Sequence, residues 1–244
     1  MSSLARTTLA TWARKTALVC AVAAGFASPA HAVIFNESGD AGQTQATAQL
    51  AAGVGVLTDI FGSLRSPLDA DLFIINITNP ATFSASTVNA TGGFLDTQLF
   101  LLTLAGAPLL LNDDDAGGLS LLSRLPAGSA ASLGAGLYLL GISQSGYDPA
   151  NIVNQLLFAS GLSTSVRGPA SGLQPAVLGQ FADNTFFVDS GPYDIQLTGV
   201  AAIPEPEIGV MLLAGGAFCA YLGSRRRRKS APAELAACAP RLPT

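Results

Sequence analysis

Carboxylates are the side chains of this sequence best able to do chemistry, and three stand together in the stretch LLLNDDDAGGLS. Asp113, Asp114 and Asp115 follow an apolar run and precede two glycines. Adjacent carboxylates repel one another, and a hard divalent cation such as calcium relieves that repulsion. Asp113 and Asp115 are the first candidates for calcium ligands, because alternate positions can converge on one ion. Asp96, which opens the preceding apolar run, is the third.

The same loop has a second interpretation that needs no metal. Asn and Asp side chains cap turns by hydrogen bonding to nearby backbone, so residues 112–115 also suit a hairpin loop. The spacing differs from that of an EF-hand, and no glutamate follows at the twelfth position. The sequence therefore leaves both a calcium site and a metal-free turn open.

The N-terminus has the pattern of a secretory signal. Basic residues precede an apolar stretch over residues 17–26, and Ala30-His31-Ala32 forms a small-x-small cleavage site. The apolar stretch is too short to span a bilayer. We therefore expect residues 1–32 to be a signal helix that is removed, so that an exported mature chain begins near Val33.

Removal of this segment leaves few groups for catalysis. The only histidine is His31, the only tryptophan is Trp12, and no cysteine lies between residues 33 and 203. A Ser-His-Asp triad needs an imidazole, a cysteine hydrolase needs a thiol, and the usual zinc sites need His or Cys. Only paired-carboxylate chemistry remains, and we expect the protein not to be an enzyme.

The charge of the same region is strongly negative. Residues 33–203 contain three arginines, no lysine and thirteen acidic residues, which leaves ten net negative charges. Such a surface repels nucleic acid and anionic membranes. We expect no nucleic-acid partner, and cations or neutral molecules suit this region better.

Short strands are the elements that must position these carboxylates. Residues 71–77, 136–142 and 193–200 carry apolar side chains at alternate positions between turn residues, which predicts strands. Residues 97–104 are apolar on both faces, which predicts a central strand. Many short strands without amphipathic helices predict an all-β fold, a jelly-roll-like antiparallel β-sandwich over residues 33–202.

Two segments are less regular. Residues 44–64 fit either a short helix or an opening strand, and Gly53 and Gly55 weaken the helix. Residues 147–182 form a long inserted excursion between two strands. Asp148 could cap a helical turn there, with Pro149 at its first position. The composition of this excursion favours a loosely packed insertion without a function.

The order of motifs in the middle of the chain resembles the bacterial pre-peptidase C-terminal (PPC-like) domain. The motifs are DADLFIINI, DTQLFLLTLAGAPLLLNDDDAGGLSLLSRL, AGLYLLGIS and GPYDIQLTGV, which together span about residues 40–200. The resemblance implies a compact β-sandwich that accompanies proteases or surface proteins and is not itself catalytic. Some members of the family bind calcium.

The C-terminal region has the composition of a short membrane span. Residues 208–224 carry no charge and reach the lower limit of length for a transmembrane helix. The basic cluster Arg225, Arg226, Arg227 and Arg228 with Lys229 would hold the following tail, residues 230–244, on the cytoplasmic side. We expect a single transmembrane helix over 208–224 and a disordered tail.

Residues 203–229 also resemble the PEP-CTERM sorting signal. Pro204, Glu205 and Pro206 precede the glycine-containing apolar run, and the arginine cluster closes it. The resemblance implies processing by exosortase in a Gram-negative bacterium. The C-terminal helix would then contact the membrane only transiently, before the protein reaches the cell surface or the medium.

These observations predict an exported, non-catalytic protein of the cell surface or extracellular matrix, associated with exopolysaccharide or biofilm. A calcium-dependent carbohydrate-binding module is the alternative, and a secreted carboxylate-dependent hydrolase is the third.

Overall fold

The computed structural model describes residues 31–88, 95–116, 121–161, 163–172, 176–185 and 189–205. Within these residues the fold is all-β and contains no helix. The strands of this part of the chain are β1 (Ala32–Asn36), β2 (Gln49–Leu50), β3 (Val56–Leu64), β4 (Ala70–Ile77), β5 (Ser84–Val88), β6 (Thr97–Thr103), β7 (Pro108–Asn112), β8 (Arg124–Leu125), β9 (Gly136–Gln144), β10 (Tyr147–Ala150), β11 (Gln180–Asp183), β12 (Gly191–Thr198) and β13 (Val200–Ala201).

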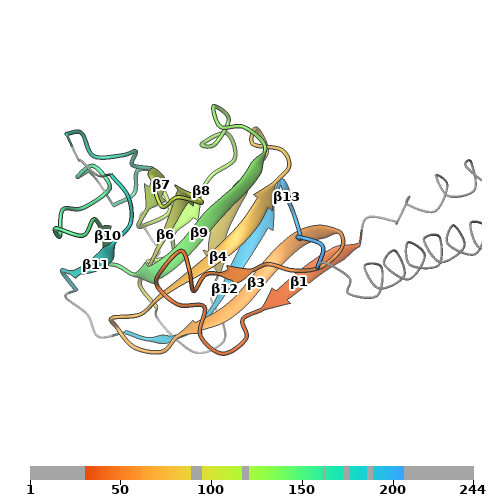
Figure 1. The fold of residues 1–244 in the computed structure, drawn as a ribbon, viewed down its shortest axis with the longest axis horizontal. Coiled ribbons are helices and arrows are strands. Elements are labelled where there is room, and N and C mark those ends of the chain that lie inside the picture. Colours follow the sequence, from red (N-terminus) through yellow and green to blue (C-terminus); the bar gives the residue numbers. More distant parts are fainter. Residues whose placement is uncertain are drawn as a thin grey trace, which may run out of the picture. The chain divides into compact units, whose positions relative to one another are not determined.

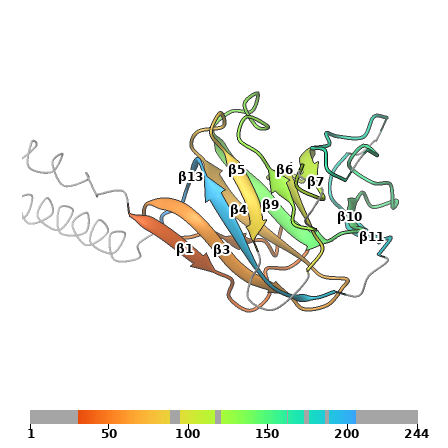
Figure 2. The same cartoon turned by 180° about the vertical axis from the view of Figure 1, so that it is seen from behind.

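Eleven strands belong to one continuous sheet with the order β7-β6-β9-β4-β13-β3-β12-β5-β8 (Figure 1). All the pairs along this path are antiparallel, whereas the added strands β1 and β2 pair parallel with β3 and β4. β13 pairs with both β3 and β4, so it joins the two halves of the sheet. The sheet curls over at this point towards a barrel, as the reverse view shows (Figure 2).

A glycine makes the bend between β12 and β13. Gly199 has a φ of 72°, and a Cβ atom there would overlap the backbone of Asn79 and Phe83. Only glycine adopts this left-handed conformation without strain and also leaves room for the neighbouring chain. The last strand can therefore leave β12 and reach β4 across the fold.

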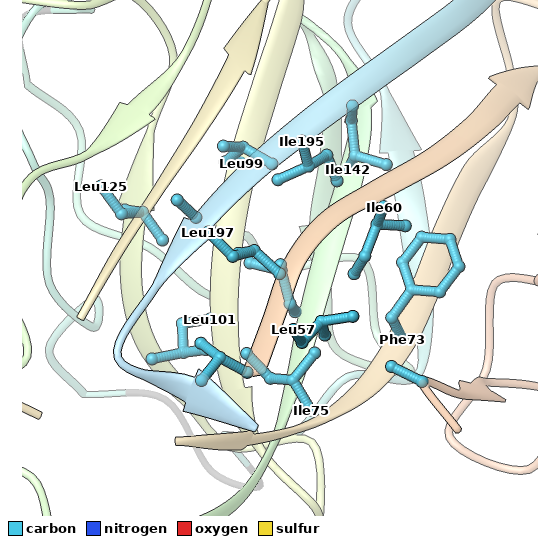
Figure 3. Close-up of a cluster of buried hydrophobic side chains, with 14 of the residues drawn as sticks. Leu57, Ile60, Phe73, Ile75, Leu99, Leu101, Leu125, Ile142, Ile195 and Leu197 are labelled. Carbon is cyan, nitrogen blue, oxygen red and sulfur yellow. The ribbon is translucent and has the colours of Figure 1, made fainter. Parts of the chain in front are cut away.

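The main core lies between the two halves of the curled sheet (Figure 3). Phe73 and Ile75 of β4 and Leu140 of β9 come from one half, and Ile60 of β3 and Ile195 of β12 from the other. The predicted alternation of strands 71–77, 136–142 and 193–200 is confirmed, because their alternate apolar residues belong to this core. Full burial of each such side chain contributes about 1.5–3 kcal/mol to stability.

A second core covers the outer face of β4, β6 and β9. Leu72, Phe100 and Leu139 point away from the main core and pack against Leu157 and Phe158 of the excursion. This contact explains why β6, which lies between β7 and β9, is buried on both faces as its sequence predicts.

The predictions for residues 147–182 are wrong in two respects. The described part of this excursion is not loosely packed, since Leu157, Phe158 and Leu178 are buried in the second core. Asp148 does not cap a helix, because it lies in β10, which pairs with β11. Asn151 instead caps a tight turn, in which its side-chain oxygen accepts hydrogen bonds from the amides of Val153 and Gln155.

The opening segment is a strand rather than a helix. β2 is short, and β3 begins directly after Gly53 and Gly55, which have φ values of 148° and 136°. These values exclude helical geometry at both glycines.

The chain divides into two units, residues 1–203 and 204–244, and the fold described above belongs to the first. Of the second unit the structure describes Pro204 and Glu205 alone. Most of the predicted signal helix over 1–32, the predicted transmembrane helix over 208–224 and the tail over 230–244 lie outside the described residues. Among the residues that are described, no helix has the length and apolar character to cross a membrane.

Candidate functional site

Three carboxylates from separate parts of the chain meet at the start of β4. Glu37 directly follows β1, Asp40 lies in the next turn, and Asp71 is the second residue of β4. One carboxylate oxygen of each lies within 4.8 Å of those of the other two. We call Glu37, Asp40 and Asp71 the carboxylate triad.

Backbone hydrogen bonds hold Glu37 in this position. Its amide donates to the carbonyl of Phe61 at 2.8 Å, which continues the pairing of β1 with β3. Its two carboxylate oxygens accept from the amides of Ala41 and Ser63, each at 2.9 Å. The carboxylate is therefore fixed before any ligand arrives.

The absence of a side chain at Gly62 makes room for the triad. A Cβ atom there would overlap the hydroxyl of Tyr193 and approach the carboxylate of Glu37. Because Tyr193 pairs directly opposite Gly62 in the sheet, no other residue fits without moving both groups.

Asp71 is the most buried member of the triad. It has no exposed surface, and its Oδ2 accepts a hydrogen bond of 2.7 Å from the hydroxyl of Tyr193. Its Oδ1 has no hydrogen-bond partner among the described residues. Such an atom is costly to bury unless a ligand or a proton satisfies it.

The electrostatics of the triad favour a cation. Burial, with smaller contributions from Glu37, Asp69 and Asp40, raises the pKa of Asp71 to about 7. Burial also raises the pKa of Glu37. A divalent cation that accepts oxygen ligands would stabilise the ionised form of both carboxylates. Calcium also tolerates the irregular geometry of three carboxylates from different segments.

The nearest basic group does not neutralise the triad. Arg65 hydrogen-bonds the carbonyl of Gly39 through its guanidinium, and its amide donates to Asp69 at 2.6 Å. Arg65 lowers the pKa of Glu37 to some extent, but among the described residues it forms no ion pair with the triad. The triad therefore remains an attractive site for a cation.

The structure places the predicted calcium ligands Asp96, Asp113 and Asp115 differently. Asp96 and Asp113 interact electrostatically: burial raises the pKa of Asp96 to about 7, with Asp113, Asp114 and Asp189 adding to the effect. Asp115 instead lies 3.8 Å from the guanidinium of Arg124, where both side chains are slightly less than half exposed. A calcium site formed by all three residues stays a prediction.

Turn hydrogen bonds and arginines organise the acidic loop. The amides of Asp114 and Asp115 donate to the carbonyls of Ser163 and Leu122, and Asn112 accepts from the amide of Arg124. Asp113 lies 4.0 Å from Arg167, although burial still raises its pKa. These contacts match the metal-free interpretation of the loop, although Oδ1 of Asp96 and Oδ1 of Asp113 have no hydrogen-bond partner among the described residues.

The sequence contained one signal for the carboxylate triad. Glu37 is the sole glutamate between residues 33 and 203, and it stands three positions before Asp40. Its proximity to Asp71 depends on the parallel pairing of β1 with β3, which local spacing does not predict.

The predicted sorting motif falls at the edge of the described chain. Pro204 and Glu205 are exposed and directly follow Ile203, which pairs with Ala52. Pro206 and the cluster Arg225, Arg226, Arg227 and Arg228 lie outside the described residues.

The fold and the site together define an all-β domain with a group of three carboxylates, of which Asp71 is buried, Glu37 is half-buried and Asp40 is exposed. A scan against protein-family models finds no match to this chain, and a search of curated proteins finds none either. The resemblances to the PPC-like domain and the PEP-CTERM signal therefore remain predictions.

Proposed function

We propose that this is an exported, non-catalytic protein of the surface or extracellular matrix of a Gram-negative bacterium, associated with exopolysaccharide. Its domain would be a jelly-roll-like β-sandwich of the PPC type, stabilised by calcium. The observation that carries the calcium proposal is the carboxylate triad, in which Asp71 is fully buried and its Oδ1 has no partner among the described residues. Extracellular calcium modules bind with dissociation constants of about 0.1–1 mM, so they are loaded outside the cell.

The sequence supports the proposed location at both ends. Residues 1–32 have the pattern of a signal peptide, and residues 203–229 resemble a sorting signal whose helix would enter the membrane transiently. Pro204 and Glu205 are exposed just after the last paired residue of the domain, a position that suits recognition by exosortase.

Mass spectrometry of the mature protein from its host tests the location. We expect a chain that begins near Val33 and has lost the arginine cluster and residues 230–244. A mature surface protein that retains the arginine cluster would refute exosortase processing, and one retained in the cytoplasm would refute export.

Calorimetric titration with calcium tests the metal site, and two variants separate the two acidic regions. Asp71→Asn should abolish calcium binding by the full-length protein, whereas Asp113→Asn should leave it within about twofold. The opposite result would move the calcium site to the acidic loop. If the titration with calcium shows no heat of binding and calcium leaves the melting temperature unchanged, both sites are refuted.

The hydrolase alternative has less support from the geometry. A general acid must reach its substrate, whereas Asp71, whose pKa is raised to about 7, has no exposed surface. The carbohydrate-binding alternative is favoured by a separate pocket, described next.

A further inference from the structure

A pocket lies between the acidic loop and the excursion, apart from the carboxylate triad. It has a volume of about 130 Å³ and is bounded by Leu111 of β7, Asp148 of β10 and the segment 156–161 with Arg167. In Figure 1 this part of the chain is the blue-green region around β10. The pocket thus lies in the excursion that departs from the strand pattern of the rest of the domain.

Arg167 is held rigidly in the wall of this pocket. Its backbone exchanges two hydrogen bonds with Leu111, of 2.9 and 2.7 Å. Its side chain is only 19% exposed, and one terminal nitrogen lies 4.0 Å from Asp113. The buried Nε has no hydrogen-bond partner among the described residues. Because Arg167 lines the pocket and part of its side chain is exposed, the terminal N–H donors of the guanidinium are the groups that a ligand oxygen can reach.

Asp148 supplies the complementary acceptor. Its Oδ2 accepts a hydrogen bond of 3.2 Å from the side-chain Nδ2 of Asn184, and Asp148 lines the pocket. The remaining lone pairs of the carboxylate can accept from ligand hydroxyls. The lining of the pocket therefore offers both a hydrogen-bond donor and an acceptor, the two functions that sugar hydroxyl groups need.

The other walls are apolar. Leu111 and Phe158 are buried, and Leu156 is 41% exposed at the side of the pocket. Apolar and aromatic walls with a few placed polar groups are typical of small-molecule sites. These side chains would contact the C–H face of a sugar ring.

The charges and the size narrow the class of ligand. Asp113 and Asp148 outnumber the single Arg167, and the domain around them is strongly acidic. Uronate or sulfate groups would be repelled. A volume of about 130 Å³ is also well below the range of roughly 300–1,000 Å³ that encloses drug-sized ligands. A pocket of this size suits the end of a polysaccharide chain better than an internal stretch of the polysaccharide.

We propose that this pocket binds one neutral terminal sugar unit of a polysaccharide, with Arg167 donating to and Asp148 accepting from its hydroxyl groups. The proposal rests on the proposed association with exopolysaccharide and names the part of the domain that makes the contact. It requires no bound metal.

Ligand-detected NMR on the full-length protein tests the proposal with neutral hexose oligosaccharides as the probes and uronate oligosaccharides as the charged comparison. Ser160 is exposed and borders the pocket, so Ser160→Trp should block it and lower affinity at least tenfold. Ser165 is also exposed on the excursion but does not border the pocket, so Ser165→Trp is the matched control. Asp148→Asn, which keeps the shape, should weaken binding severalfold.

Each outcome decides the proposal. Binding of neutral sugars that is lost in Ser160→Trp and kept in Ser165→Trp supports it, provided that both variants melt like the parent. Equal binding by both tryptophan variants overturns the site, and a preference for uronates overturns the ligand class. A protein found at the cell surface that binds no neutral sugar refutes this inference alone, whereas a protein retained in the cell refutes the proposed function alone.

Discussion

Replacement of Asp71 by asparagine isolates the contribution of the carboxylate triad. The amide has the shape of a protonated carboxyl, and its oxygen can still accept the hydrogen bond from Tyr193. The carboxylates of Glu37 and Asp40 stay close to this position, each with an oxygen within 4.8 Å of a carboxylate oxygen of Asp71. The variant therefore removes the titration and a cation ligand while it keeps the packing.

The magnitude follows from the pKa of Asp71 in the metal-free protein. Burial raises that pKa from 3.8 to about 7. Between these values the native state binds a proton that the unfolded chain does not, so this contribution to stability is complete below pH 4 and is lost as the pH rises through 7. The free energy of unfolding that is lost in this way amounts to at most about 4 kcal/mol. This corresponds to a fall of about 8–16 °C in Tm for a chain of this size.

Chemical denaturation between pH 4 and pH 8, with chelator or with calcium, measures this effect. With chelator, the stability of the parent should fall more steeply with pH than that of Asp71→Asn. At pH 8, calcium at a hundred times its Kd should add about 2.7 kcal/mol to the parent and nothing to the variant. Parallel pH profiles, or an equal calcium increment in both proteins, would refute the reasoning.

Three further changes test other parts of the structure. Gly62→Ala should lower the free energy of unfolding by about 1–3 kcal/mol and weaken calcium binding, because its Cβ would overlap a tyrosine hydroxyl. Gly134→Ala is the control: it has open space around it and should be neutral in the same denaturant titrations. Leu157→Ala should lower the free energy of unfolding by about 2–5 kcal/mol if the excursion closes the second core. Ile152 is exposed, so Ile152→Ala should lower it by less than about 0.5 kcal/mol. Small losses in both variants would mean that the excursion does not support the fold. Asp96→Asn should reduce the fall in stability that accompanies a rise of the pH through about 7, since burial raises the pKa of Asp96 to that value. If the variant and the parent lose the same stability between pH 5 and pH 8 in denaturation experiments, this prediction is wrong.

Local pattern predicted four of the longer strands, β4, β6, β9 and β12. Period-two alternation places Phe73 and Ile75 on one face of β4 and Leu72 on the other, because successive side chains of a strand point to opposite sides. The run of residues 97–104, apolar on both faces, correctly predicted that β6 is central and doubly buried. The inventory of reactive side chains is likewise a property of composition and needs no structure.

The carboxylate triad and the pocket were decided only by the tertiary structure. Glu37 and Asp71 are far apart in the sequence, and they meet because β1 lies parallel to β3 and Tyr193 of β12 bridges to β4. The excursion gave no periodic signal, since its apolar residues become buried by covering the outer face of strands formed elsewhere. Sequence spacing carries information about neighbours along one element, whereas these sites depend on pairings between distant elements. Turn hydrogen bonds and arginine contacts organise the acidic loop, which is a local feature of the sequence, whereas the fold assembles the carboxylate triad from distant segments.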